Sequence, residues 1–76
     1  MKYNKVEALL ALKGKSLTEY AEFMKVSKQQ ISNKKKTDTF KVDDFINLAE
    51  LTETRLAFID KNGEPIIKFD SNDLSD

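Results

Sequence analysis

Amide, hydroxyl and ammonium groups gather between Ser27 and Lys36, where the chain reads SKQQISNKKK. Glutamine and asparagine side chains can hydrogen-bond to adenine, and lysine can donate to guanine, at base edges in the major groove. Lysine also binds phosphate oxygens without regard to base sequence. No acidic residue occurs from Lys25 through Thr37. The segment has the composition of a surface that reads nucleic acid, although the same side chains are ordinary on a solvated helix.

Apolar residues on either side of a two-residue link predict two short helices that meet at a sharp turn. The first spans about residues 17–24, and its inward residues recur at helical spacing: Leu17, Tyr20, Ala21 and Met24. The second spans about residues 28–35, with Ile31 as its inward anchor. The link of Lys25 and Val26 is so short that it allows only a tight turn between the two helices. A helix-turn-helix is therefore predicted at residues 16–36, and duplex DNA is the usual partner of that motif.

Capping boxes predict where three helices begin, because a hydroxyl or amide residue is followed three positions later by Glu or Gln. The three pairs are Asn4 with Glu7, Ser16 with Glu19, and Ser27 with Gln30. Gly14 is well placed to end the first helix in the left-handed conformation. A fourth helix is predicted over about residues 42–53, with an apolar stripe of Val42, Phe45, Ile46 and Ala49.

The outward side of the second helix of the motif supplies the predicted site. We expect DNA base contacts from Lys28, Gln29, Ser32 and Asn33. We expect contacts to the DNA backbone from Ser16, Thr18, Ser27, Lys34, Lys35 and Lys36.

The overall composition argues against catalysis. The 76 residues contain neither histidine nor cysteine, which removes the commonest general base and the usual metal ligands. Asp43 and Asp44 are adjacent at a helix start, where they suit capping better than acid–base chemistry. We expect no enzyme, no catalytic residue, no metal site and no cofactor. A core this small also shows no ligand pocket, and no apolar run is long enough for a membrane helix.

A net charge of zero hides a strong segregation of charge along the chain. Residues 1–12 carry +1, residues 13–41 carry +5 and residues 42–76 carry −6. The basic part coincides with the predicted helix-turn-helix. One face can therefore approach phosphate while the acidic half stays away from it.

The last third changes to the alternation of β-strands. Two strand-like runs, residues 56–60 and 64–70, flank Asn62-Gly63, which is the strongest short signal for a β-hairpin. A two-residue turn would pair Ile59 with Ile66 and place one face against the helices: Leu56, Phe58, Ile67 and Phe69. The other face is predicted to join a second copy of the chain through Ala57, Ile59, Ile66 and Lys68. The alternative is that this hairpin merely caps the core. The acidic tail, residues 71–76, is expected to fray.

Together these residues resemble the lambda-repressor-like family, which includes phage Cro and the repressors named after the xenobiotic response element. The resemblance covers roughly residues 4–53: Ala21 is similar to the small residue between the two helices, Val26 to the first apolar residue after the turn, and Ile31 to the anchor of the second helix. Residues 44–49, DFINLA, are similar to the fourth helix of the family.

Three departures from the family pattern stand out. Lys25 occupies the turn position where the family usually has glycine. A left-handed conformation at a residue other than glycine costs on the order of 1 kcal/mol. A run of lysines stands near Lys34 where the family carries an apolar or acidic residue, and a hairpin replaces a fifth helix, similar to Cro proteins that dimerise through strands.

The leading expectation is one mostly α (α+β) domain over residues 1–76: four helices to residue 53, a hairpin at 55–70 and the tail. The resemblance implies a cytoplasmic, nucleoid-associated regulator encoded by a bacterium or phage, which binds palindromic double-stranded DNA as a homodimer and acts on transcription as a repressor. The alternative is a protein-interaction module, such as an antitoxin or adaptor, that uses the hairpin and acidic tail.

Overall fold

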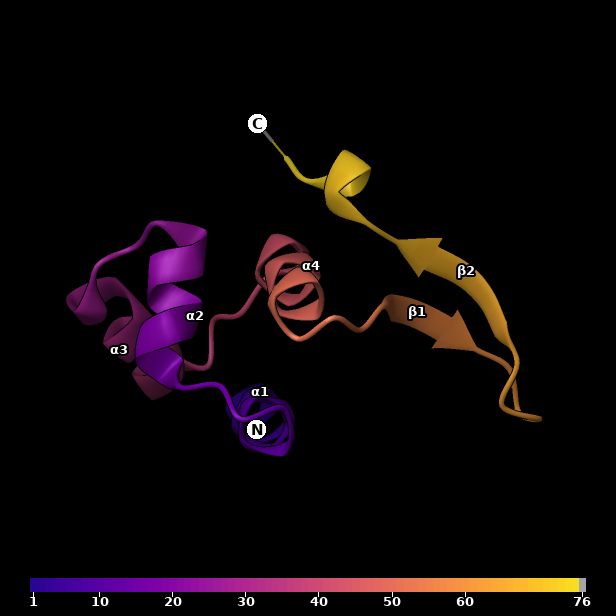
Figure 1. Cartoon of the computed structure of the whole chain (residues 1–76), viewed down its shortest axis with the longest axis horizontal. Helices are drawn as coiled ribbons and strands as arrows, with labels where there is room; N and C mark the ends of the chain where they lie inside the picture. The colour runs from indigo at the N-terminus through magenta and orange to yellow at the C-terminus, as the bar shows by residue number, and fades with distance from the viewer. Residues whose placement is uncertain (76) are drawn as a thin grey trace.

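A computed structural model describes residues 1–75, which fold into four α-helices and an antiparallel β-hairpin (Figure 1). The elements are α1 (Lys2–Leu12), α2 (Leu17–Met24), α3 (Lys28–Thr37), α4 (Val42–Leu51), β1 (Leu56–Ile59), β2 (Pro65–Phe69) and a short 3-10 helix, η1 (Ser71–Asp73). The predicted fold class, mostly α with a C-terminal hairpin, is confirmed. Within these residues, no helix combines the length and apolar character needed to cross a membrane.

The core lies where all four helices meet around an aromatic residue from a loop. Val6, Tyr20 and Ile31 are buried there by their helices. Phe40, in the loop before α4, is also buried, and its ring centroid lies 6.1 Å from that of Tyr3 and 6.4 Å from that of Tyr20. Burial of one such aromatic side chain contributes about 1.5–3 kcal/mol. Phe40 therefore links α1 and α2 from the loop between α3 and α4.

The start of α1 differs from the prediction, because Asn4 lies inside the helix and forms no capping box with Glu7. The Asp38 carboxylate, which follows α3, accepts the backbone N–H of Tyr3 at 2.9 Å and that of Lys2 at 3.2 Å. Tyr3 is buried, so the helix packs on the core from its first turn. A distant carboxylate therefore replaces the local cap.

The end of α4 also differs from the prediction, at Leu51 in place of about residue 53. The Thr52 hydroxyl donates to the Leu48 carbonyl at 2.7 Å, and the next residue, Glu53, adopts a left-handed conformation with φ 56°. Val42 is 54% exposed and does not join the inward stripe, in which Leu48 is buried.

The hairpin turn is one residue longer than predicted, and this changes the strand register. The Asp60 N–H donates to Glu64 O at 2.9 Å, and the Gly63 N–H donates to Asp60 O at 3.0 Å. With Gly63 at φ +88°, the loop is a three-residue turn ending in a left-handed residue. A β-bulge follows, so Ile59 pairs with Pro65 and not with Ile66.

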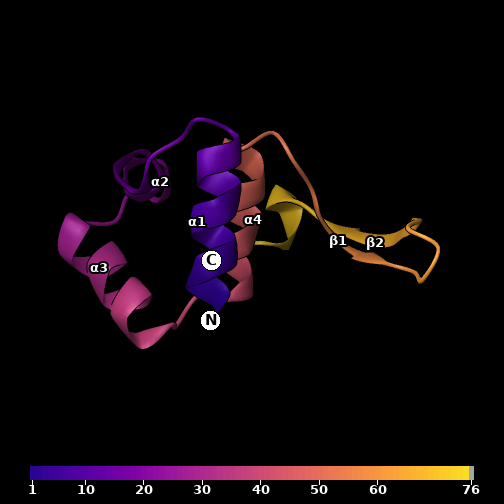
Figure 2. The same ribbon diagram turned by 90° about the horizontal axis from the view of Figure 1, so that it is seen from below.

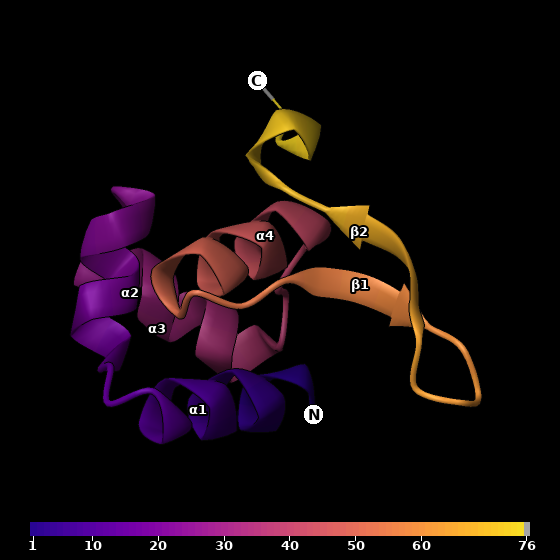
Figure 3. The ribbon, with the colours of Figure 1, turned by 45° about the vertical axis from the view of Figure 1, so that its right-hand side comes forward.

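The register further from the turn is as predicted. Phe58 pairs with Ile67, and Leu56 pairs with Phe69. Of these four, only Leu56 and Phe69, at the base of the hairpin, are half-buried. The expected packing of the other two on the helices is wrong, because Phe58 is 64% exposed and Ile67 is 55% exposed. The hairpin projects away from the helices (Figures 2 and 3).

The acidic tail is folded where fraying was expected. The Asp70 carboxylate accepts the N–H of Asn72 at 2.9 Å, and the Asp70 N–H donates to the Asp73 carboxylate at 2.9 Å. The Ser75 N–H donates to the Asp43 carboxylate at 3.0 Å, which joins this segment to α4. Asp76, the last residue of the predicted tail, lies outside the described residues.

Candidate nucleic-acid interface

The turn between α2 and α3 is built by local hydrogen bonds. Lys25 takes a left-handed conformation, with φ 59° and ψ 39°, and Val26 N–H donates to Ala21 O at 3.0 Å. The Ser27 hydroxyl accepts the Gln30 N–H at 3.1 Å, while the Gln30 side chain accepts the Ser27 N–H at 2.7 Å. The predicted turn and the predicted cap of α3 are confirmed.

The four predicted base-contact residues, Lys28, Gln29, Ser32 and Asn33, are all exposed on α3. Ile31 is 3% exposed and fixes which side of α3 faces the core. At 3.6 residues per turn, a residue two positions before or after Ile31 lies about 200° around the helix. Gln29 and Asn33 therefore occupy the outermost side of α3, and Lys28 and Ser32 lie nearer its flank.

The two outermost amides contact each other. Gln29 Nε2 donates a hydrogen bond to Asn33 Oδ1 over 3.2 Å. The remaining amide of this helix, Gln30, is held by the cap with Ser27. Gln29 and Asn33 therefore present their polar groups as a pair.

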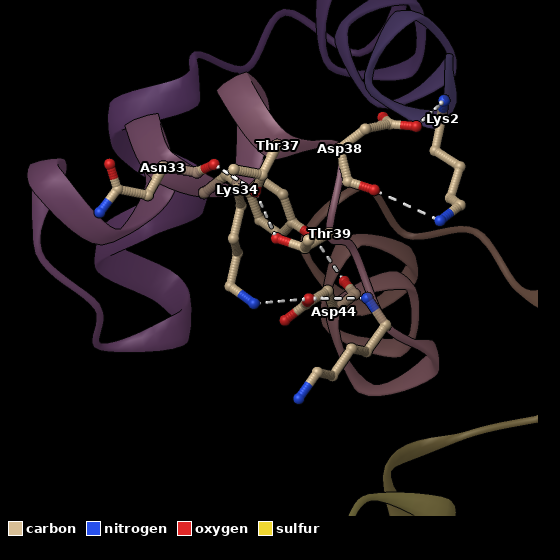
Figure 4. Close-up of polar contacts among 9 residues, drawn as sticks. Lys2, Asn33, Lys34, Thr37, Asp38, Thr39 and Asp44 are labelled. Atoms are coloured by element: carbon tan, nitrogen blue, oxygen red, sulfur yellow. Dashed lines mark hydrogen bonds and ion pairs between the residues drawn. The ribbon is translucent and has the colours of Figure 1, made fainter.

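Lys34 does not lie on this outward face, contrary to the prediction of a DNA backbone contact. Its ammonium forms an ion pair with the Asp44 carboxylate at 2.9 Å, and the two side chains are only 23% and 12% exposed (Figure 4). The same carboxylate accepts the Lys41 N–H at 2.9 Å at the start of α4. Lys34 follows Ile31 by three residues, so helical spacing alone places it towards the core.

Asp44 also connects α4 to α2, because the Tyr20 hydroxyl in α2 donates to the Asp44 backbone carbonyl. Burial, assisted by the nearby Asp44 charge, raises the pKa of Tyr20 well above its ordinary value of 10. The hydroxyl therefore stays a proton donor throughout the neutral range. Asp44 thus connects the helices that orient α3, a role the sequence indicates only as a favourable charge in the first turn.

Lys35 and Lys36 are exposed near the end of α3, as a phosphate-contacting role requires. Lys35 Nζ lies 5.2 Å from the centroid of the Tyr3 ring, a cation–π geometry. Both lysines and Ser32 border a hollow between α3 and α1 that also includes Glu7. This flank of α3 is thus bounded by α1, whereas Gln29 and Asn33 lie on the open side.

The two helix starts differ as sites for phosphate. Ser16 caps α2 with Glu19, whose carboxylate accepts the Ser16 N–H at 3.0 Å. This negative charge opposes an incoming phosphate at Ser16 and at the neighbouring exposed Thr18. The equivalent position in α3 is the neutral Gln30, so Ser27 offers a helix start without an acidic side chain.

The residues predicted to join two chains lie at the other end of the molecule from α3 (Figure 2). Ile59 and Ile66 are 62% and 63% exposed, Lys68 is exposed, and Ala57 is half-buried. Because Phe58 and Ile67 are exposed as well, apolar side chains occupy both faces of the hairpin. The exposed apolar surface is therefore larger than the sequence predicts.

Comparison with known proteins gives no family assignment. No protein-family model matches the chain, and neither the curated proteins nor the solved structures contain a significant match.

Proposed function

We propose that the chain is a sequence-specific regulator of transcription that inserts α3 into the major groove of double-stranded DNA. The observation that carries the proposal is the outward side of α3, where Gln29 and Asn33 lie opposite the buried Ile31. Amides in this position have the donors and acceptors needed to distinguish base pairs. The lysines of the same segment supply attraction to phosphate.

The distribution of charge favours one approach to DNA. The segment 13–41 carries +5 and includes α3, whereas the segment 42–76 carries −6 and includes the hairpin. The two elements lie at opposite ends of the molecule (Figure 2). Long-range electrostatics therefore favours approach with α3 first and disfavours approach with the hairpin first.

We further propose that the active form is a homodimer joined through the hairpin, which binds an inverted repeat. Phe58, Ile59, Ile66 and Ile67 each expose more than half of their side chains. Four such residues leave on the order of 400 Å² of apolar surface, divided between the two faces of the hairpin. Association of two hairpins through the face of Ile59 and Ile66 removes part of this surface from water.

Salt-dependent binding to a pool of random duplexes tests the charge assignment. The test variant replaces three exposed lysines of α3 with alanine: Lys28, Lys35 and Lys36. The control variant removes the same charge elsewhere, at Lys13, Arg55 and Lys61. The logarithm of the binding constant is plotted against the logarithm of the salt concentration between about 50 and 200 mM. The negative slope should become shallower by about three units in the test variant and stay near the wild-type value in the control. Equal losses in the two variants would contradict binding through α3.

The second candidate function is a protein-interaction module, such as an antitoxin or adaptor. It is favoured by one observation, the exposure of apolar residues on both faces of the hairpin. The folded acidic segment 70–75 would then form part of the same working surface. The two functions are separated by where substitutions act, because DNA binding depends on α3 and a protein complex depends on the hairpin.

A further inference from the structure

We infer that Gln29 and Asn33 form one reading unit for adenine, an inference that rests on the proposed function. In this unit, Gln29 contacts the base, and Asn33 is a positioning residue that orients the Gln29 amide. The two residues therefore have different roles, although sequence reasoning treats both as base readers.

The hydrogen bond between the two side chains is the starting observation. Gln29 Nε2 donates to Asn33 Oδ1 at 3.2 Å. A spacing of four residues places side chains one above the other on the same helix face. Both are exposed, and both lie on the side of α3 opposite Ile31. The pair therefore sits where the floor of a major groove would be.

The chemistry of the remaining amide edge selects the base. Gln29 Nε2 carries two hydrogens, and the bond to Asn33 uses one of them. The other hydrogen and Oε1 form an edge with one donor and one acceptor. Adenine presents the N7 acceptor and the N6 amino donor in the major groove, which matches this edge. Guanine presents two acceptors, N7 and O6, so Oε1 would face a second acceptor there.

Asn33 contributes by pairing with the Gln29 amide, in an arrangement in which Asn33 Oδ1 accepts from Gln29 Nε2. The terminal torsion of glutamine is broad, so an unrestrained amide can turn over and exchange oxygen and nitrogen. A reversed amide would set donor against donor and acceptor against acceptor at adenine. Because Asn33 offers an acceptor oxygen to Nε2, it favours the orientation that matches adenine.

Neighbouring side chains do not offer the same combination. Gln30 is held in the cap of α3, where its side-chain oxygen accepts the Ser27 N–H at 2.7 Å. Ser32 has a hydroxyl that both donates and accepts, so it distinguishes adenine from guanine poorly. Of the two hydrogen-bonded outward amides, Gln29 lies nearer the start of α3, which is the end of such a helix that contacts base edges.

Parallel selections from random duplexes distinguish positioning from direct reading. The proteins are wild type, Gln29→Ala, Asn33→Ala, Asn33→Asp and the control Asn4→Ala, which removes an exposed amide from α1. Gln29→Ala should lose an adenine preference at one position of the site. Asn33→Ala should weaken the preference at that same position by roughly tenfold and alter no other position. Asn33→Asp keeps an acceptor oxygen, so it should retain the adenine preference that Asn33→Ala weakens. Its added negative charge should lower the affinity for all sequences. Asn4→Ala should retain the adenine preference.

A chemical substitution in the DNA checks the base atom. Replacement of the selected adenine by 7-deazaadenine should lower wild-type affinity roughly tenfold and leave Gln29→Ala binding almost unchanged. Loss of preference at a second, separate position in Asn33→Ala would overturn the inference and leave the proposed function intact. Absence of any enriched duplex with the wild type would overturn the proposed function and the inference with it.

Discussion

At the scale of residues, two carboxylates take positions that tie distant segments together. Asp38 caps α1 across 35 residues of sequence, and Asp44 pairs with Lys34 of α3. The sequence predicts the local caps of Ser16 and Ser27 correctly, because donor and acceptor lie three residues apart. It does not predict the role of Asp38, because that contact depends on where the loop after α3 runs in space.

Asp38 predicts a specific dependence of stability on pH. The backbone N–H of Tyr3, with a smaller contribution from that of Lys2, lowers the pKa of the Asp38 carboxyl below its ordinary value of 3.8. A lowered folded-state pKa means that the carboxylate stabilises the fold above the unfolded-state pKa and loses this effect as pH falls through the folded-state pKa. Asp38→Asn should therefore be less stable than wild type at pH 7.

Denaturant titrations at a series of pH values measure this effect. The difference in unfolding free energy between the two proteins should shrink as pH falls below about 4. A difference that stays constant from neutral pH to about pH 3 would show that the charge of Asp38 does not act through the start of α1.

Replacement of Lys34 is expected to lower the stability of the fold. The sequence alone predicts that the same replacement lowers DNA affinity. Lys34→Met leaves the Asp44 carboxylate, in a residue only 9% exposed, without its ion-pair partner. The expected loss in unfolding free energy is about 1–3 kcal/mol, and it should diminish in a background that carries Asp44→Asn. The exposed Lys36→Met is the matched control and should change stability by less than about 0.5 kcal/mol. A Lys34 variant as stable as this control would refute the structural role.

At the scale of elements, α2 and α3 are predicted almost residue for residue, and the hairpin is not. Both helices carry local signals: an inward stripe, a capping box and a short turn. The hairpin prediction is wrong at the turn. Asp60 accepts the backbone N–H groups of Asn62 and Glu64 and so favours a three-residue loop. The exposure of Phe58 depends on whether the helices leave an apolar surface for it, which no local pattern records.

The turn that joins α2 to α3 carries a testable strain. Lys25 is left-handed at φ 59°, a conformation that favours glycine. Lys25→Gly should raise the unfolding free energy by about 0.5–1 kcal/mol, since relief of the strain exceeds the added entropy of the unfolded chain. Thermal or denaturant unfolding measures it. The control is Lys13→Gly, at φ −97°, which should destabilise the protein. If both substitutions destabilise, the turn does not carry the expected strain.

At the scale of the whole molecule, the hairpin and α3 lie far apart. The longest dimension is 38 Å, with α3 towards one end and the hairpin at the other (Figure 2). The sequence identifies both surfaces, since charge segregation and strand alternation are visible along the chain. It underestimates the apolar surface of the hairpin, because the position of Phe58 and Ile67 is set by the finished core.

We expect the wild-type chain to form a dimer through the hairpin. Ile59→Asp combined with Ile66→Asp should convert a dimer to a monomer at micromolar concentration, because each charge would have to be buried without a partner. Sedimentation equilibrium measures the mass, and the circular dichroism of the helices checks the fold. The double variant Leu12→Asp and Phe23→Asp replaces exposed apolar residues outside the hairpin and is the control. A wild-type chain that sediments as a monomer would exclude the hairpin dimer.

The most direct test of DNA recognition is selection of bound duplexes from a random library by the wild-type protein at about 150 mM salt, near physiological ionic strength. Enrichment of an inverted repeat, with half-site centres about 10 base pairs or a multiple of that apart, is the predicted result. Its spacing would report the distance between the two α3 helices. Weak, salt-sensitive retention without any enriched sequence would contradict the account and favour a protein-interaction module.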